Sequence, residues 1–150
     1  MRKFKTVFMR GGTSKGCMFH KEDLPEDRKE WDNIFLQCMG DPDPKQIDGL
    51  GGTVSSNNKI VIVWKSEEPG VEYLVGQVIV GKSQVDYKSN CGNMTAAVGP
   101  YAVEEGMVDI VEPITTVRML NRNTDKYINV TVPIDPETKT FAQEGDCAIA

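Results

Sequence analysis

Residues 90–93, Asn-Cys-Gly-Asn, carry the side chain best suited to chemistry in this chain, the thiol of Cys91. If a helix begins here, its first N–H groups and the positive end of its dipole favour a thiolate and bind a carboxylate or phosphate. Gly92 leaves the backbone open to a ligand, because it has no side chain. The alternative is a buried cysteine that acts as a small apolar residue, which is common. The polar neighbours Asn90 and Asn93 favour the first interpretation.

The residues after Cys91 predict the helix that this chemistry needs. Asn90 is the predicted N-cap, because its side-chain oxygen can accept from a first-turn N–H group. Gly106 is expected to end the helix. Pro100 removes one helical hydrogen bond, so a kink or break is expected near Gly99 and Pro100. Apolar residues recur at helical spacing between these ends: Met94, Ala97, Val98 and Tyr101.

A second polar stretch, Arg-Gly-Gly-Thr-Ser-Lys-Gly, occupies residues 10–16. It is rich in hydrogen-bond donors and poor in bulky side chains, so its backbone could wrap around an anion. A plain hairpin turn is an equally good interpretation. Strands are predicted on both sides, over residues 4–9 and 17–20.

A third stretch, residues 48–58, is long, polar and rich in glycine, and it leads into Lys59 and the apolar run 60–64. Loops of this length without apolar anchors are often functional. A lysine whose stem is partly desolvated at the start of an apolar strand can serve as a base. The ordinary alternative is a surface lysine that begins a strand.

Residues 76–83, Gly-Gln-Val-Ile-Val-Gly-Lys-Ser, match the P-loop pattern of nucleotide-binding proteins letter by letter. A P-loop is a flexible loop between a strand and a helix. Here the middle residues are strand formers, and residues 84–87 also favour extended structure. The match is therefore interpreted as chance, with a strand over 71–80 that ends at Gly81. A nucleotide-binding protein is kept as a third hypothesis.

The remaining pattern predicts one more helix and several strands. The helix runs from Leu24-Pro25 to about Met39, and Gly40 ends it. Its apolar face is Trp31, Ile34, Phe35 and Cys38. Further strands are predicted over 114–120, 127–133 and 140–144. Many strands joined mostly by hairpins, with two helices, indicate an α+β fold with a largely antiparallel sheet against the Cys91 helix.

Composition narrows the partners and the compartment. The length of 150 residues fits one domain, and the net charge of -5 argues against nucleic acid as a partner, because phosphate binding needs a basic face. There is no apolar run of 18 residues and no signal-peptide pattern, so no membrane contact is expected and the cytoplasm is the predicted compartment. Four cysteines lie far apart and are expected to be reduced: Cys17, Cys38, Cys91 and Cys147. No metal site is predicted, since His20 is the single histidine.

Three stretches in this order, residues 9–16, 47–52 and 90–93 with Gly99-Pro100, resemble the PrpF family. That family includes 2-methylaconitate cis–trans isomerase, methylitaconate Δ-isomerase and 4-oxalomesaconate tautomerase. The resemblance implies the diaminopimelate-epimerase fold, in which two similar domains each curl a sheet around a central helix and the site lies between them. It also implies proton transfer along the allylic system of a small unsaturated di- or tricarboxylate, without metal or organic cofactor.

The resemblance also implies roles for single residues. Lys59 resembles the proton-abstracting lysine of the family, Cys91 its partner at the central helix, and Ser14 a residue close to the substrate. Which of Lys59 and Cys91 removes the proton stays open. The predicted substrate-binding residues are Arg10, Gly12, Thr13, Lys15, Ser56, Gly92 and Asn93.

One departure from the family concerns length, because its members are more than twice as long. Residues 1–150 are therefore expected to be the N-terminal domain of a two-domain enzyme, with the second domain absent from this chain. An exposed half-site favours association, so a homo-oligomer is one expectation. A non-catalytic carboxylate-binding or accessory domain, or a related racemase or epimerase, is the alternative function.

Overall fold

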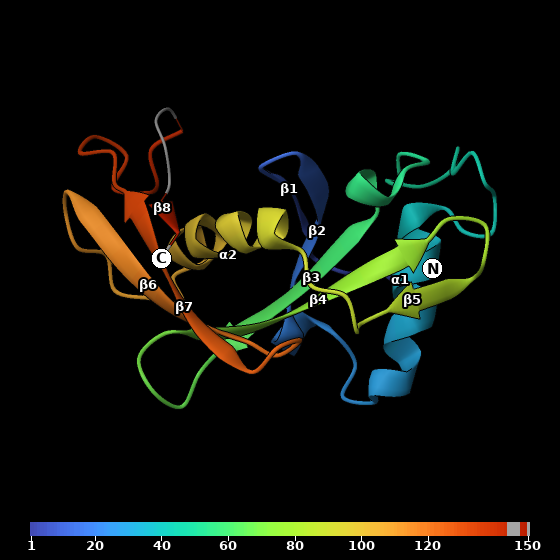
Figure 1. Ribbon diagram of the computed structural model, residues 1–150, viewed down its shortest axis with the longest axis horizontal. Helices are drawn as coiled ribbons and strands as arrows, with labels where there is room; N and C mark the ends of the chain where they lie inside the picture. The colour runs from blue at the N-terminus through green and yellow to red at the C-terminus, as the bar shows by residue number, and fades with distance from the viewer. Residues whose placement is uncertain (144–147, 150) are drawn as a thin grey trace.

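One curled sheet organises the chain (Figure 1). The computed structural model describes residues 1–143 and the backbone of residues 148–149. Within them the sheet has eight strands in the order β1-β2-β3-β4-β6-β7-β8, and β5 pairs with β4. The strands are β1 (Val7–Gly11), β2 (Ser14–His20), β3 (Lys59–Lys65), β4 (Val71–Ile79), β5 (Gln84–Asp86), β6 (Ile114–Asn121), β7 (Lys126–Pro133) and β8 (Ala148–Ile149).

The sheet is largely antiparallel, as predicted, but two of its strand pairs are parallel. They are β2 with β3 and β4 with β6. Parallel neighbours cannot be joined by a tight hairpin and need a crossover connection. The two crossovers, residues 21–58 and 80–113, contain the helices α1 (Trp31–Met39) and α2 (Gly92–Glu104). Each helix therefore lies in a crossover between two parallel strands, whereas the sequence predicts strands that are mostly joined by hairpins.

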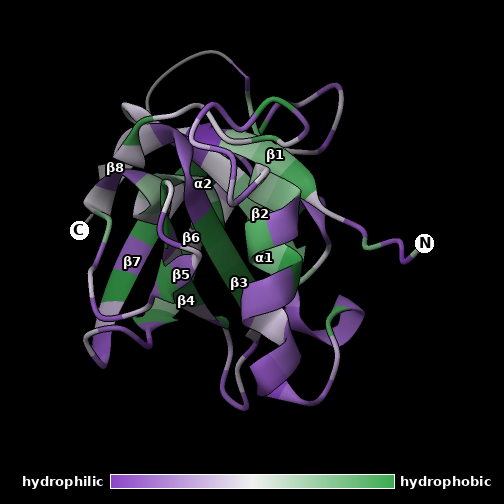
Figure 2. Cartoon of the chain, turned by 90° about the vertical axis from the view of Figure 1, so that its right-hand side faces the viewer, coloured by the Kyte–Doolittle hydropathy of each residue, from purple (hydrophilic) through white to green (hydrophobic). Residues whose placement is uncertain are grey.

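The two helices cover opposite faces of the same strands. In β3, Val61 and Val63 pack in the cluster around α2, whereas Ile60 and Ile62 pack in the cluster that contains α1. Figure 1 shows α2 in the hollow of the sheet and α1 against its other face, and Figure 2 shows β3 as a hydrophobic strand between them. The predicted α+β class, with a curled sheet around a central helix, is confirmed.

Helix α2 continues through Pro100, so the predicted break there is wrong. Nearly every residue around the proline is buried against the sheet, and this packing outweighs the one hydrogen bond that proline cannot make. Gly99 allows the close approach, because a Cβ on it would lie 2.8 Å from Val130 Cγ1. The helix ends at Glu104, and Gly106 follows with φ of +68°, as the sequence predicts.

Helix α1 begins later than predicted, at Trp31 rather than near Leu24. The indole Nε1 of Trp31 donates to Pro25 O at 2.9 Å, and the Asp27 carboxylate accepts from Lys29 N at 3.0 Å. The second bond caps the 3-10 helix η2 (Arg28–Glu30), and the His20 side chain caps the earlier 3-10 helix η1 (Lys21–Asp23), so the segment before α1 forms turns and 3-10 helices. The predicted end at Gly40, with φ of +90°, is confirmed.

Three smaller predictions meet the structure differently. The P-loop match falls on the end of β4 and the turn before β5, with no helix after Ser83 until Gly92, so the pattern is not a P-loop. The strand predicted over 140–144 is not formed in 140–143, where Phe141 makes a single bridge to Ile134, and residue 144 lies outside the described part. None of the helices in the described residues is both long and apolar enough to span a bilayer.

Candidate active site

The hairpin of β1 and β2 presents the Arg10–Lys15 stretch to the start of α2. Gly11 pairs with Ser14, so Gly12 and Thr13 form a two-residue turn. Gly12 has φ of +54°, and a Cβ on it would lie 2.4 Å from Asn93 Oδ1. A side chain at this position would therefore be strained and would push the turn away from the helix. The stretch is a hairpin turn, and it packs on the first turn of α2.

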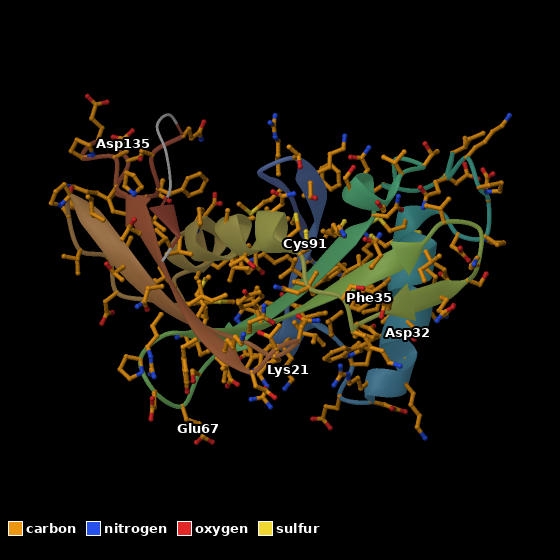
Figure 3. All side chains as sticks on the ribbon, viewed as in Figure 1. Lys21, Asp32, Phe35, Glu67, Cys91 and Asp135 are labelled. Carbon is orange, nitrogen blue, oxygen red and sulfur yellow. The ribbon has the colours of Figure 1, made fainter. Side chains whose placement is uncertain are left out.

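Cys91 and Ser14 meet where this turn touches the helix. Cys91 is the N-cap residue of α2 and is 8% exposed, and its Sγ donates to Ser14 Oγ across 3.7 Å. Asn93 Nδ2 donates to Thr13 Oγ1 at 2.9 Å and lies 3.5 Å from Ser14 Oγ. Figure 3 shows Cys91 at the start of α2, beside the β1–β2 hairpin. Four residues singled out in the sequence thus form one hydrogen-bonded group.

The predicted N-cap is wrong by one residue, because Cys91 and not Asn90 occupies that position. The Asn90 side chain is turned away, and its Oδ1 accepts from Asn121 Nδ2 at 2.9 Å. The Cys91 side chain makes no capping bond. The N–H groups of the first turn are thus not occupied by a cap side chain, which suits an anion site. A Cβ on Gly92 would meet nothing within 4 Å, so the space in front of this turn is open.

A surface cavity of about 360 Å³ lies next to this group. Its lining residues are Arg10, Thr13, Ser14, Lys15 and Asn57. Among these described residues two are cationic and none is acidic, although the chain carries a net charge of -5. Other cavities, of about 400 to 440 Å³, lie away from the three motifs, so the site is placed here by its chemistry and not by cavity size.

Ser56 was predicted to bind substrate, but Asn57 and not Ser56 lines this cavity. Both belong to the short helix η3 (Ser55–Asn57) before β3. An amide at the end of a glycine-rich loop is the only sequence signal that could have pointed to Asn57. Arg10 is also partly engaged within its own turn, since its Nε donates to Gly12 O at 2.7 Å.

Lys59 is the first residue of β3, is half-buried, and does not line the cavity. Residues two apart on a strand share a face, so Lys59 lies on the α2 side with Val61. It pairs with Gly16 in β2 and with Gln77 in β4, and its Nζ donates to Gln77 Oε1. The structure thus puts Lys59 on the same sheet face as Ser14, held by a glutamine that the sequence did not single out.

The glycine-rich segment before Lys59 is held by buried amide side chains. Gln46 Oε1 accepts from Thr53 N at 2.8 Å, and Gln46 Nε2 donates to Asn58 Oδ1. Asn58 Nδ2 donates to Val54 O at 2.9 Å. Gln77 Nε2 adds bonds to Ser55 O at 3.0 Å and to Asn58 O at 3.2 Å. Sequence reasoning missed these residues, which shape the loop and so place Asn57 at the cavity and Lys59 on its strand.

A second polar network holds the start of α2 from behind. Thr95 Oγ1 donates to Cys91 O at 3.2 Å and lies 2.9 Å from the hydroxyl of Tyr73, which is fully buried. Burial raises the pKa of Tyr73, so the hydroxyl stays protonated and can donate. The network therefore fixes the backbone that carries the Cys91 thiol.

Asn123 fixes the segment that leads to Cys91. Its Oδ1 accepts from Val75 N at 2.8 Å, and its Nδ2 donates to Val75 O at 2.8 Å and to Tyr87 O at 2.7 Å. Asn121, fully buried, holds Asn90 as described above. The sequence predicts residues 121–125 only as a turn, so it gives no sign of these roles.

The model of the family described as PrpF protein matches residues 1–150. The chain belongs to the PrpF family. The putative isomerase YraM of Bacillus subtilis is 45% identical to this PrpF chain over all of it and 41% of the relative. The 3-methylitaconate isomerase of Eubacterium barkeri is 42% identical over 95% of the chain and 38% of the relative.

A solved structure of a methylitaconate-delta-isomerase superposes on this PrpF chain with a TM-score of 0.89 and 39% identity. The match covers 97% of the chain and 38% of that structure, and it confirms the predicted fold family. The chain spans about two fifths of the length of the relatives that it matches.

Proposed function

We propose that the chain supplies one half of the active site of a cofactor-independent isomerase that moves a proton within a small unsaturated di- or tricarboxylate. The observation that carries the proposal is the contact of Cys91 with Ser14 at the open N-terminus of α2, beside a cavity that Arg10 and Lys15 make cationic. The relatives named methylitaconate isomerases support this substrate class.

The proposed reaction removes a proton from an allylic carbon and returns one at the far end of the allylic system. The double bond moves and the composition of the acid does not change. Removal leaves an enolate-like anion, which oriented N–H groups and positive charge stabilise. The first turn of α2 supplies the N–H groups, and Arg10 and Lys15 supply the charge. Lys59 and Cys91 are the two groups proposed to take and give the proton.

Lys59 Nζ donates to Gln77 Oε1 in this structure. We propose that the substrate carboxylate displaces this bond. A proposed second domain faces the cavity and excludes water from it, which strengthens the electrostatic interactions in the site. We also propose that the protein acts in the cytoplasm and that it associates with further copies of itself.

The test follows proton exchange by NMR in deuterated water. A PrpF protein of full family length that contains these 150 residues is incubated with methylitaconate, methylaconitate or oxalomesaconate. We expect deuterium at the allylic carbons of one acid and conversion to its isomer. Lys59→Ala and Cys91→Ser should each abolish both signals.

Lys65→Ala is the matched control for the lysine, because Lys65 is exposed at the other end of β3. Cys38→Ser is the control for the cysteine, because Cys38 lies on α1 and outside the cavity. Both controls should keep the exchange. Carboxylate binding without any deuterium uptake would overturn the isomerase proposal in favour of a non-catalytic binding domain.

A further inference from the structure

Cys17 and Cys38, which the sequence separates by 21 positions, bring their sulfur atoms together behind the sheet. Their Sγ atoms are 3.7 Å apart, within reach of a thiol hydrogen bond. Cys17 lies on β2, on the face opposite to α2, and Cys38 lies in the last turn of α1. Neither residue has a part in the proposed reaction, and both are free thiols.

Only one of the two thiols can be reached from outside. Cys17 is fully buried, whereas Cys38 is half-buried and lines a surface cavity of about 400 Å³. The residues that line this cavity with Cys38 include Arg2, Asn33 and Gln37. A small polar molecule in this cavity therefore meets the Cys38 sulfur first, with Cys17 directly behind it.

The contact also makes the two thiols chemically unequal. The hydrogen bond from the Cys17 thiol lowers the pKa of Cys38, because it stabilises the Cys38 thiolate. The same contact, together with burial, raises the pKa of Cys17. The Cys38 sulfur, which lines the cavity, is thus the better nucleophile, whereas Cys17 stays a protonated thiol.

We propose that Cys17 and Cys38 form a redox-modification site that a hydroperoxide converts into an intramolecular disulfide. The Cys38 thiolate attacks the hydroperoxide, the O–O bond breaks, and Cys38 becomes a sulfenic acid as the alkoxide leaves, which is hydroxide when the oxidant is hydrogen peroxide. The Cys17 thiol then attacks the Cys38 sulfur, the S–S bond forms, the S–O bond breaks, and water leaves. Two thiols and one hydroperoxide thus give one disulfide, water and the reduced hydroperoxide, with two electrons passed to oxygen.

The disulfide would couple to the elements that carry the candidate site. Cys17 is three residues after Ser14 on β2 and pairs with Ile60, the residue next to Lys59. At the other partner, Cys38 O accepts from Leu50 N at 2.9 Å, which anchors the glycine-rich loop to the end of α1. The disulfide would therefore join β2, which carries Ser14, to the end of α1, which anchors the glycine-rich loop.

Tryptic peptide mapping tests the proposal directly, because each cysteine falls in its own peptide: residues 16–21, 30–45, 89–118 and 140–150. The chain is treated with one equivalent of hydrogen peroxide, its free thiols are alkylated, and the digest is analysed by mass spectrometry. We expect peptide 16–21 linked to peptide 30–45, about 2 Da below the sum of the two, and separated again by dithiothreitol. This readout is independent of isomerase activity.

Cys38→Ser is the main variant, because a half-buried serine leaves the fold intact. It should remove the linked species and leave Cys17 open to alkylation only after unfolding. In Cys17→Ala, Cys38 should oxidise more slowly and proceed to the sulfinic acid, because no resolving thiol is present. Cys91→Ser should not change the link. Oxidation of wild-type Cys38 to sulfinic acid without a link to Cys17, or a link of either residue to Cys91, would overturn the proposal.

Discussion

Asn123→Ala should lower the free energy of unfolding of the chain by about 3 kcal/mol, because it removes a set of side-chain hydrogen bonds. Asn123 makes three side-chain bonds of 2.7 to 2.8 Å, two with the backbone of Val75 and one with Tyr87 O. Each such bond contributes about 1 kcal/mol. The loss is compounded because Val75 is 2% exposed, so water cannot easily replace the bond that its N–H group loses.

Urea unfolding followed by circular dichroism measures this loss. With an m-value of about 1.5 to 2 kcal/mol/M, the midpoint should fall by about 1.5 to 2 M while the slope stays the same. Asn33→Ala is the matched control, because Asn33 is exposed on α1 and accepts one bond, from Gln37. Its midpoint should change by less than about 0.3 M, which corresponds to about 0.5 kcal/mol.

Asn123→Asp separates the donor role from the acceptor role. The carboxylate can still accept from Val75 N, but its second oxygen faces the carbonyl oxygens of Val75 and Tyr87. It should cost at least as much as the alanine variant at pH 7 and recover in part below pH about 4, where the acid can donate. Equal midpoints for Asn123→Ala and Asn33→Ala would refute the reasoning, since the hydrogen bonds of Asn123 would then contribute nothing to the free energy of unfolding.

Three further predictions concern packing, a buried bond and pH. Gly99→Ala brings a methyl group to 2.8 Å from Val130 Cγ1 and should cost about 1 to 3 kcal/mol, whereas Gly92→Ala, with nothing within 4 Å, should cost less than about 0.5 kcal/mol; equal melting temperatures would contradict this. Tyr73→Phe removes the bond to Thr95 and should cost about 1 kcal/mol in urea unfolding; an unchanged midpoint would show that the bond contributes nothing. Burial raises the pKa of Tyr101, so its stabilisation is complete below pH about 10 and is lost as the pH rises further, because only the unfolded chain then releases the proton. Tyr101→Phe should reduce the fall in stability above pH 10, and an unchanged fall would assign it to other groups.

The sequence predicts those features of the fold that depend on interactions between residues close together in the chain. The helix after Cys91, its end at Gly106 and the apolar faces of both helices depend on residues within a few turns of one another. The P-loop match was rejected on the same ground, because its residues prefer a strand. These features could be read from spacing and residue type alone.

Other features depend on partners far away in the chain. The parallel pairing of β2 with β3 and of β4 with β6 is decided by which strands meet, and the alternation of apolar residues is the same for either direction. Asn121 looks like a turn residue in the sequence, but it is fully buried and donates to Asn90. Because Asn90 lies 31 positions away, no local pattern indicates this contact. The continuity of α2 through Pro100 likewise depends on the sheet that surrounds it.

The two crossovers also have a consequence for folding kinetics. Strands β3 and β4 can pair as a local hairpin, but β2 and β6 join them only after residues 21–58 and 80–113 have been closed into loops. Closing a long loop costs chain entropy before the native contacts form that compensate for it, and this slows folding. Ser14 precedes the first crossover and Cys91 lies within the second, so their contact spans 77 positions and requires the closure of residues 21–58 and the docking of α2 on the β1–β2 hairpin. The Cys91 thiol should therefore become protected during refolding no faster than β2 pairs with β3.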